Sequence, residues 1–286
     1  MIASNLSPGK KKLTELKQAV VVITGATGGF GVEFAKQLYQ AGSRLILSDL
    51  SQELLSNTAA SVEQSVESNS QKNSNKCGEI LGCVAADLSD RQGREHLYQQ
   101  FKALAIPIDI LINNAGIGIF GRMDEVPVEH WEKLMQVNLI APMALSALFV
   151  TDMIAQKKGH IVNISSLAGW FSSAGMAHYS ASKFGLRGFS EGLANEVREY
   201  NVKVTAVYPF FSRTPILNSP RYGTLAEQTN DFADKSVSNP ADVVRVTIKA
   251  IKSDRAAVFP DPVAKQVYVL KRLFPRLFDW LVSKMN

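Results

Sequence analysis

Two side chains that could share a proton, Tyr179 and Lys183, lie four residues apart in the sequence. In a helix, this spacing places both side chains on the same face. A phenol titrates near pH ~10, so alone it is a poor base at neutral pH. A nearby ammonium favours the phenolate and lowers the phenol pKa, so the pair could exchange a proton with a substrate oxygen. The same spacing is common on solvated helices, so its meaning depends on the other elements of the chain.

A glycine-rich turn follows an apolar, β-branched run. Residues 19–24 predict a strand buried on both faces, and residues 25–31 (Gly-Ala-Thr-Gly-Gly-Phe-Gly) lead into a helical pattern. Such a unit binds the phosphates of dinucleotides, because glycines let the backbone approach the pyrophosphate and the helix N-terminus offers free N–H groups. The next strand, at 44–48, ends at Asp49, about 20 residues on, where an acid can bind ribose hydroxyls. A plain tight turn and a strand-end cap are the alternatives, but the order of the parts favours a dinucleotide site.

Strand and helix patterns alternate along the rest of the chain. This alternation predicts a single α/β domain over residues 19–262, with a doubly wound, Rossmann-type parallel sheet. Small or polar residues follow several strands: Asp87-Leu88, Asn113-Asn114-Ala115-Gly116 and Pro209. A ligand crevice is expected at these carboxyl ends, although Asp87 could instead be a helix N-cap. Three segments without periodicity are interpreted as a polar leader (1–18), a flexible insertion (64–76) and a substrate lid (210–238).

The residues from 20 to 259 resemble the short-chain dehydrogenase/reductase family. Thr24-Gly25-x-x-x-Gly29-x-Gly31 and Asn113-Asn114-Ala115-Gly116 match two of its motifs, and its catalytic tetrad is matched by Asn138, Ser166, Tyr179 and Lys183. Ser166 is preferred to Ser165 because it lies thirteen residues before Tyr179, as in the family.

The resemblance implies a role for each residue of the tetrad. Tyr179 exchanges a proton with the substrate oxygen, Lys183 holds the nicotinamide ribose, Ser166 hydrogen-bonds the substrate oxygen, and Asn138 holds a water that links Lys183 to solvent. The implied cofactor-binding residues are Gly25, Thr27, Gly28, Gly29, Phe30, Gly31, Asp49, Asp87, Leu88, Asn114, Ala115, Gly116, Tyr179, Lys183, Pro209 and Thr214. Phe210 departs from the family, which has glycine there, and a turn with φ > 0 would be costly for Phe.

Electrostatics favours NAD over NADP. Asp49 can accept two ribose hydroxyls but would repel a 2′-phosphate, and residues 24–34 contain no Arg or Lys to bind that phosphate. Arg44 begins the second strand instead of ending it, which places it too far away.

The expected substrate is a hydrophobic alcohol or ketone of steroid, retinoid or long-chain lipid type. This expectation rests on apolar candidate pocket positions, namely Ile117, Ile119, Trp170, Phe171, Met176, Phe210 and Phe211. The alternative is that several of them simply pack the core or a subunit contact. A cofactor-binding regulator without turnover, or a related epimerase or dehydratase, are the alternative functions.

Residues 263–284 interleave apolar and basic side chains. Such a segment can lie on a membrane surface, pack across a subunit interface or cover the substrate cleft, and Pro275 limits an unbroken helix. The resemblance implies a homodimer or homotetramer formed through the helices at 128–156 and 179–200.

The composition is that of a globular protein, with 46% hydrophobic and 20% charged residues. The net charge is +5, but the sequence lacks the stripe of Lys and Arg with interleaved aromatic residues that binding of nucleic acid would require. Two cysteines are too few for a disulfide framework or a zinc site, so no metal is expected. The sequence has no apolar run that reaches the ~18 residues expected of a membrane span. A cytoplasmic protein is therefore expected.

Overall fold

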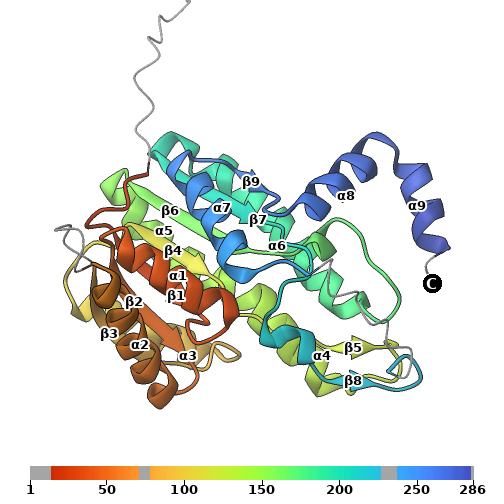
Figure 1. Cartoon of the computed structure of the whole chain (residues 1–286), viewed down its shortest axis with the longest axis horizontal. Coiled ribbons are helices and arrows are strands. Elements are labelled where there is room, and N and C mark those ends of the chain that lie inside the picture. The colour runs from red at the N-terminus through yellow and green to blue at the C-terminus, as the bar shows by residue number, and fades with distance from the viewer. Residues whose placement is uncertain (1–13, 71–77, 227–236, 285–286) are drawn as a thin grey trace, which may run out of the picture.

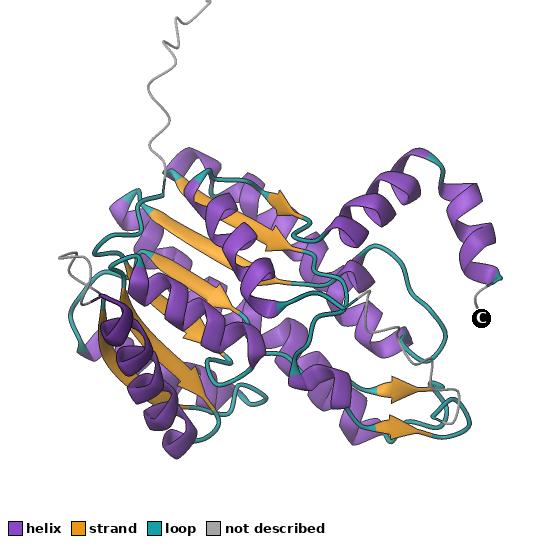
Figure 2. Cartoon of the chain, viewed as in Figure 1, coloured by secondary structure: helices purple, strands orange, loops and turns teal. Residues whose placement is uncertain are grey.

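The apolar, β-branched runs pair into one parallel sheet of seven strands in this computed structural model, in the order β3-β2-β1-β4-β6-β7-β9 (Figures 1 and 2). The structure describes residues 14–70, 78–226 and 237–284. The strands are β1 (Val20–Thr24), β2 (Arg44–Asp49), β3 (Glu79–Ala85), β4 (Ile110–Asn113), β6 (Gly159–Ile164), β7 (Val202–Val207) and β9 (Ala257–Val258). The predicted doubly wound α/β fold is therefore confirmed.

Helices cover both faces of the sheet, because helical crossovers connect the successive parallel strands (Figure 2). One face carries α1 (Gly29–Gln40), α2 (Gln52–Ser70) and α7 (Pro240–Lys252). The other carries α3 (Arg91–Ala103), α5 (Ala141–Gln156) and α6 (Ala177–Glu196), and α4 (Val128–Met135) packs beside α6. Two further helices, α8 (Pro262–Leu273) and α9 (Pro275–Ser283), end the chain.

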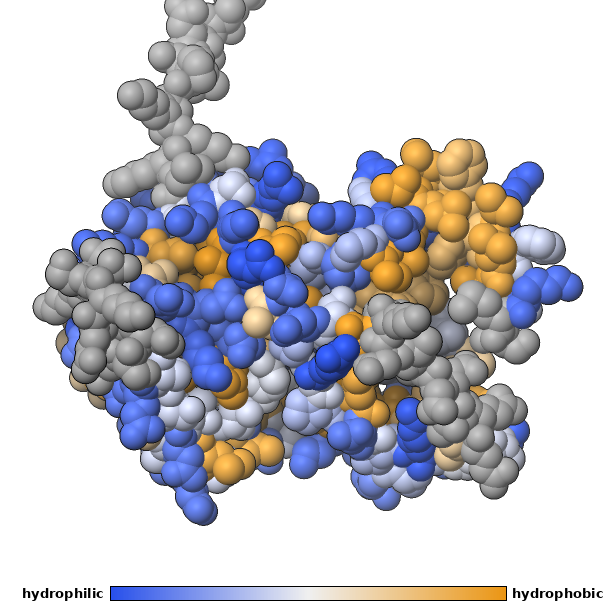
Figure 3. Space-filling model, viewed as in Figure 1, coloured by the Kyte–Doolittle hydropathy of each residue, from blue (hydrophilic) through white to orange (hydrophobic). Residues whose placement is uncertain are grey.

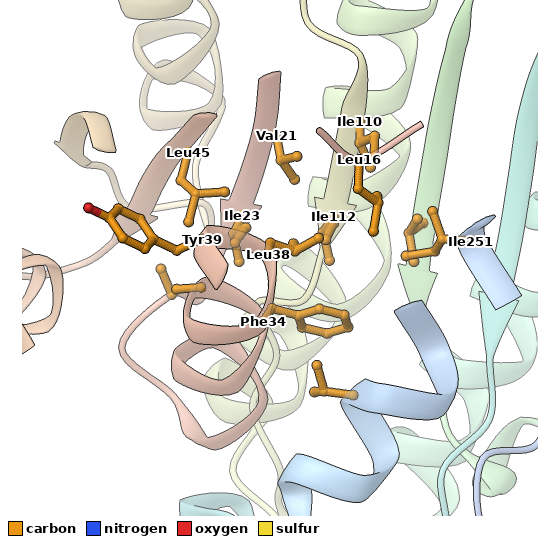
Figure 4. Packing of buried hydrophobic residues seen from close by; sticks show 14 of the residues in the cluster. Leu16, Val21, Ile23, Phe34, Leu38, Tyr39, Leu45, Ile110, Ile112 and Ile251 are labelled. Carbon is orange, nitrogen blue, oxygen red and sulfur yellow. The ribbon is translucent and has the colours of Figure 1, made fainter. Parts of the chain in front are cut away.

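Two apolar cores hold these layers together. Phe34 and Leu38 of α1 pack against Ile23 and Ile112 of the sheet and Ile251 of α7 (Figure 4). The second core lies on the opposite face and joins α3, α5 and α6 to the strands, with Leu97, Phe101, Leu145, Phe149, Met153 and Leu193. Strands buried on both faces need near-continuous apolar sequence, as β1 has.

The strand order reverses between β1 and β4. From β1 the chain builds outward through β2 and β3, then returns to pair β4 with the other edge of β1 and continues through β6, β7 and β9. Such a reversal leaves a crevice beyond the carboxyl ends of β1 and β4, where ligands bind in open α/β sheets. Thr24 and Asn113 end these two strands, so the predicted motifs meet at this crevice.

A separate two-stranded sheet lies beyond the main one. β5 (Phe120–Gly121) pairs with β8 (Arg221–Tyr222), and a short 3₁₀ helix, Pro215–Asn218, precedes β8. The predicted lid at 210–238 therefore carries regular structure in part, and residues 227–236 of it lie outside the described residues.

Two of the predicted unstructured segments are wrong in part. The leader was expected to reach residue 18, but Leu16 is buried in the first core and Thr14 hydrogen-bonds His160 at 2.9 Å. The insertion was expected to begin at residue 64, but α2 continues to Ser70 because Val62 and Val66 extend its buried stripe. Residues 1–13 and 71–77 lie outside the described residues.

The helical run from Val128 to Gln156 is long and apolar enough to cross a membrane, contrary to the expectation that no such run exists. Its inner face is buried, and Leu145, Phe149 and Met153 belong to the second core. We interpret it as a core helix because its apolar residues pack against the sheet.

Candidate active site

The end of β4 holds the glycine-rich turn in place. The Asn114 amide donates to the backbone oxygens of Thr24 and Gly25 at 3.0 and 2.9 Å. The Thr24 hydroxyl in turn accepts the N–H groups of Asn114 and Ala115, both at 3.1 Å. Gly25 has φ +64°, and a Cβ there would lie 2.7 Å from the Ala115 Cα. Only glycine allows this close approach of the two strand ends.

The glycine turn opens directly into α1. Gly28 is the N-cap residue, no side chain caps the helix, and its first turn contains no acid. A Cβ on Gly31 would lie 2.0 Å from the Gly25 carbonyl oxygen. The Thr214 side chain covers the turn, since a Cβ on Gly29 would lie 2.6 Å from its Cγ2. Uncapped N–H groups beside a bare backbone turn form an anion site of the kind that binds a pyrophosphate.

Asp49 lies beside this turn at the end of β2. Its Oδ2 accepts the Thr27 N–H at 2.9 Å and the Thr27 hydroxyl at 2.6 Å, while its Oδ1 accepts the Leu50 N–H at 2.8 Å. The carboxylate therefore fixes the turn and places a negative charge next to it. Phe30, by contrast, packs against the first core, so its side chain has a structural role.

The helix N-cap alternative for Asp87 is wrong, whereas the cofactor contacts of Asp87 and Leu88 stay a prediction. Asp90, not Asp87, caps α3 by accepting the Gly93 N–H at 2.6 Å, because the helix begins three residues later than expected. The exposed Asp87 carboxylate accepts the Ser89 N–H at 2.8 Å, and the Ser89 side chain, with a smaller contribution from this N–H, lowers the pKa of Asp87. The Leu88 side chain is buried in the second core, which leaves only its backbone for a ligand.

Helix α6 carries Tyr179 and Lys183 on the face that meets β6 and the loop after it. Lys183 is buried and donates to the Ile164 carbonyl at 3.0 Å, and its Nζ lies 5.6 Å from the centre of the Tyr179 ring. The Ser166 side chain lies near enough to the Tyr179 phenol to lower its pKa, and it accepts the Ala168 N–H at 3.1 Å. Ser165 instead donates to the Lys183 carbonyl at 3.1 Å, so it positions α6. Ser166, Tyr179 and Lys183 thus converge.

Burial sets the charge state of this pair. It raises the pKa of Tyr179 to about 12, with a smaller lowering by the Ser166 side chain, and it lowers the pKa of Lys183 to about 8. The expected lowering of the phenol pKa by Lys183 is absent, because desolvation disfavours both charged forms and the ammonium binds a carbonyl. The Tyr179 phenol is therefore protonated at neutral pH.

Asn138 lies in a π-helical turn, Gln136–Ile140, between α4 and α5. Its buried amide accepts the Ile117 N–H at 2.8 Å and donates to the Ile117 carbonyl at 2.9 Å. A Cβ on Gly116 would lie 3.4 Å from the Asn138 oxygen and 3.7 Å from the Lys183 Nζ. Single π turns recur at functional sites, and this one brings Asn138 toward Lys183.

A buried polar chain that was not predicted from the sequence anchors these elements. Asn113 of β4 donates to Asn163 of β6 at 2.8 Å and to Ser146 of α5 at 3.2 Å. Asn163 donates to Ser190 of α6 at 2.9 Å. Buried amides need such partners, so this chain fixes α5 and α6 against the sheet. The available signal was an Asn inside an otherwise apolar strand.

The predicted substrate pocket divides into packing residues and loop residues. Ile119 is buried in a small core with Val126 and Leu134, which corrects its assignment to the pocket. Trp170 packs between the Arg187 guanidinium, 3.4 Å from the ring centre, and Tyr268 of α8. Ile117 and the aromatic or sulfur side chains of the loops after β6 and β7 stay partly buried: Phe171, Met176, Phe210 and Phe211.

Phe210 fits its turn without strain. It is absent from the residues with positive φ in the described part of the chain, so the glycine of the family is not required here. Its N–H donates to Asp261 Oδ2 at 2.9 Å, and Asp261 also caps α8 by accepting the Ala264 N–H at 2.7 Å. The turn that follows Pro209 is thus tied to the C-terminal helices, and Asp261 is a second residue that sequence reasoning missed.

Taken together, the crevice fits a dinucleotide. Its bare turn and uncapped helix would hold the phosphates, Asp49 would face a ribose, and Lys183, Tyr179 and Thr214 would border the reactive end. A neutral phenol and a serine hydroxyl lie together beside that end, which suits proton exchange with a carbonyl or carbinol oxygen.

Comparison with known proteins supports this interpretation. The family model described as short chain dehydrogenase matches residues 19–223. "Dehydrogenase/reductase SDR family member 7B" of Xenopus tropicalis is 33% identical over 270 residues, covering 92% of this chain and 84% of the relative. "3-Dehydrosphinganine reductase" of Danio rerio is 30% identical over 250 residues, covering 87% and 72%.

Solved structures agree. A metagenomic short-chain oxidoreductase in complex with NADP is 31% identical with a TM-score of 0.68, covering 86% of this chain and 99% of that one. A short-chain dehydrogenase/reductase of Burkholderia phymatum in complex with NAD is 25% identical with a TM-score of 0.75, covering 92% and 96%. The chain therefore belongs to the short-chain dehydrogenase/reductase family, the NAD(P)-dependent oxidoreductases that act on CH–OH and keto groups.

Proposed function

We propose that the chain interconverts a hydrophobic, lipid-like secondary alcohol and its ketone, with Tyr179 as general acid and base. The observation that carries this proposal is the convergence of Ser166, Tyr179 and the buried Lys183, whose Nζ lies 5.6 Å from the centre of the Tyr179 ring, beside loops rich in aromatic residues. The bound nicotinamide supplies or accepts the hydride. In ketone reduction, the neutral Tyr179 hydroxyl donates its proton to the substrate oxygen, while Ser166 stabilises the charge that develops there.

Lys183 and Asn138 complete the proposed proton path. The Lys183 amine has a pKa of about 8, so near neutral pH it can exchange protons with the Tyr179 phenol. The Asn138 amide hydrogen-bonds the Ile117 backbone, and both its oxygen and the Lys183 Nζ lie next to Gly116. We propose that this arrangement holds a water which returns protons from solvent.

The lipid-like substrate is supported by two observations. Phe171, Phe210 and Phe211 lie in the loops that follow β6 and β7, at the strand ends that form the crevice. A relative with 30% identity is named for 3-dehydrosphinganine. Apolar side chains favour substrates whose hydrocarbon surface is exposed to water in the free state and is buried on binding.

A ketone series tests the substrate class. Because each buried methylene contributes roughly 0.8 kcal/mol, two added methylenes should raise kcat/KM about tenfold until the pocket is filled. The assay follows cofactor absorbance with straight-chain ketones of increasing length and with 3-dehydrosphinganine. Activity confined to small polar polyols would contradict the proposal, and absence of turnover with every substrate would favour a cofactor-binding regulator.

We propose NAD as the preferred cofactor. The Asp49 carboxylate lies at the turn, whereas Arg44 pairs with Glu79 at 3.1 Å at the opposite end of β2. Solved relatives bind either NAD or NADP, so the family alone does not decide the preference.

The cofactor preference predicts a measurable asymmetry. In the wild type, KM for NAD should be at least about tenfold below KM for NADP, since like charges near one site cost on the order of 1 kcal/mol or more. Asp49→Asn keeps a hydrogen-bond acceptor and the shape of the side chain but removes its negative charge. The variant should therefore have a KM for NADP that is lowered toward its KM for NAD. A clear wild-type preference for NADP would refute the assignment.

We propose a cytoplasmic homo-oligomer. Ile140 and Met143 of the α4–α5 run and Phe184 of α6 are exposed apolar residues on the helices expected to form the subunit contact. Within the described residues Cys83 forms no disulfide, which fits a reducing compartment. Sedimentation velocity of the purified chain should give a dimer or tetramer.

A further inference from the structure

Helices α8 and α9 form an arm that projects from the body of the molecule (Figure 1). Only its inner face is attached. The Tyr268 ring stacks on Phe259 at 4.1 Å between ring centres, and Phe278 packs edge-on against Phe171 at 5.2 Å. Ala264 and Phe278 are the buried residues of the two helices. These aromatic contacts fix the direction in which the arm points.

The outer face of the arm is apolar and exposed. Six of the fourteen large exposed hydrophobic residues in the described part of the chain lie here, between 39% and 63% exposed: Val269, Leu273, Phe274, Leu277, Trp280 and Leu281. Figure 3 shows an apolar patch over the arm. Contiguous exposed apolar surface of this kind marks an interaction site.

Basic side chains border this patch. Residues 263–284 contain five basic residues (Lys265, Lys271, Arg272, Arg276 and Lys284) and one acid, Asp279. Asp279 pairs with Lys271 at 2.5 Å, which leaves the segment with most of the net charge of the chain. An isologous contact with a second copy would bring two such basic borders together, which like-charge repulsion opposes. The charge instead complements an anionic surface.

The arm also has the dimensions of an interfacial element. Its helices have 12 and 9 residues, separated at Pro275, so neither reaches the ~20 residues needed to span a bilayer. Amphipathic helices with Lys and Arg beside a face of Leu, Phe and Trp lie in the plane of the interface. Trp280 is a side chain that prefers the headgroup level.

From these observations we propose that the α8–α9 arm docks the protein on the surface of an anionic lipid bilayer. The apolar patch enters the boundary between headgroups and acyl chains, and the basic border contacts lipid phosphates. Asp261 joins the arm to the Phe210 turn, and Phe278 joins it to Phe171, so docking brings both crevice loops to the bilayer. The docking rests on the arm itself and does not depend on the substrate.

Vesicle co-sedimentation of the full chain tests the proposal. The wild type should pellet with vesicles of phosphatidylcholine and phosphatidylserine, bind phosphatidylcholine alone more weakly, and dissociate as salt is raised. The double variant Leu277→Ser with Trp280→Ser should lose about tenfold or more in partitioning, because both side chains leave water on docking. The matched control, Leu54→Ser with Leu104→Ser, changes exposed apolar residues elsewhere and should bind like the wild type.

The charged border is tested separately. Arg272→Gln with Arg276→Gln should weaken binding to the anionic vesicles alone, whereas Lys249→Gln with Lys252→Gln on α7 should not. Equal pelleting of both double variants and their controls, or no pelleting of the wild type, would overturn the proposal. So would loss of the oligomer in the Leu277/Trp280 variant by sedimentation velocity without lipid, because the arm would then be a subunit interface. Since these readouts need no turnover, they stand apart from the ketone assay.

Discussion

The Tyr179→Phe variant should lose about a thousandfold in kcat while it keeps its fold and its affinity for nucleotide. The substitution removes only the phenol hydroxyl, and the ring stays in its partly buried position beside Lys183. With a pKa of about 12, this hydroxyl is protonated at neutral pH, and in the proposed mechanism it gives its proton to the ketone oxygen.

The measurement is single-turnover and steady-state reduction of the best ketone, with nucleotide Kd from fluorescence titration and stability from thermal unfolding. Tyr200→Phe is the matched control, because Tyr200 lies in the 3₁₀ turn after α6, away from the crevice. A kcat near that of the wild type would remove Tyr179 from the mechanism. A loss of nucleotide affinity as large as the loss of kcat would assign it a binding role instead.

The second large effect is expected from Gly31→Ala in the turn before α1. The new Cβ would lie 2.0 Å from the Gly25 oxygen and 2.7 Å from the Ala26 Cα, and both neighbours are backbone. The turn must therefore move, which should cost about 1–3 kcal/mol of stability and should disrupt the N–H groups that face the phosphates. We expect Kd for the dinucleotide to rise about tenfold or more, since one lost charge-assisted hydrogen bond is worth on the order of 1.5 kcal/mol.

Gly192→Ala provides the control within the same fold. Gly192 lies inside α6 with no atom within 4 Å of a Cβ placed there, so the change should stabilise the protein by about 0.5–1 kcal/mol and leave Kd unchanged. Isothermal calorimetry and urea unfolding of both variants provide the comparison. If Gly31→Ala binds the dinucleotide as tightly as Gly192→Ala does, the turn is not the phosphate site.

The C-terminal segment shows where a sequence pattern leaves the outcome open. Interleaved apolar and basic residues are compatible with packing and with membrane contact alike. The structure divides the roles by face, because Tyr268 and Phe278 find aromatic partners on the body, whereas Leu273 and Trp280 find none and stay exposed. The division depends on where Phe259 and Phe171 lie in space, which periodicity does not encode.

The pocket assignment shows the same limit. Ile119 and Trp170 were grouped with Phe171 and Phe210 because all four are apolar and lie near motif residues. Folding placed Ile119 in a small core and Trp170 between Arg187 and Tyr268. An apolar side chain lowers its free energy equally well by packing or by lining a site, so its type alone does not distinguish the two.

Local rules sufficed for the parts that repeat along the chain. Runs such as residues 20–24 can be satisfied only as buried strands, and alternation with helices then requires a parallel sheet. Gly25, at φ +64°, and Gly31, under the Gly25 oxygen, are needed wherever this turn forms, so the sequence by itself determined the fold class and the dinucleotide crevice. The order of Asn138, Ser166, Tyr179 and Lys183 pointed to the family.

Only the tertiary structure decided how those residues meet and which charge they carry. The π turn that brings Asn138 to Ile117, and the chain from Asn113 through Asn163 to Ser190, join segments far apart in sequence. Desolvation, which depends on everything packed around Tyr179 and Lys183, raises one pKa and lowers the other, against the expectation from their spacing. Spacing along a helix determines which side chains are neighbours, whereas burial and long-range hydrogen bonds determine their protonation and position.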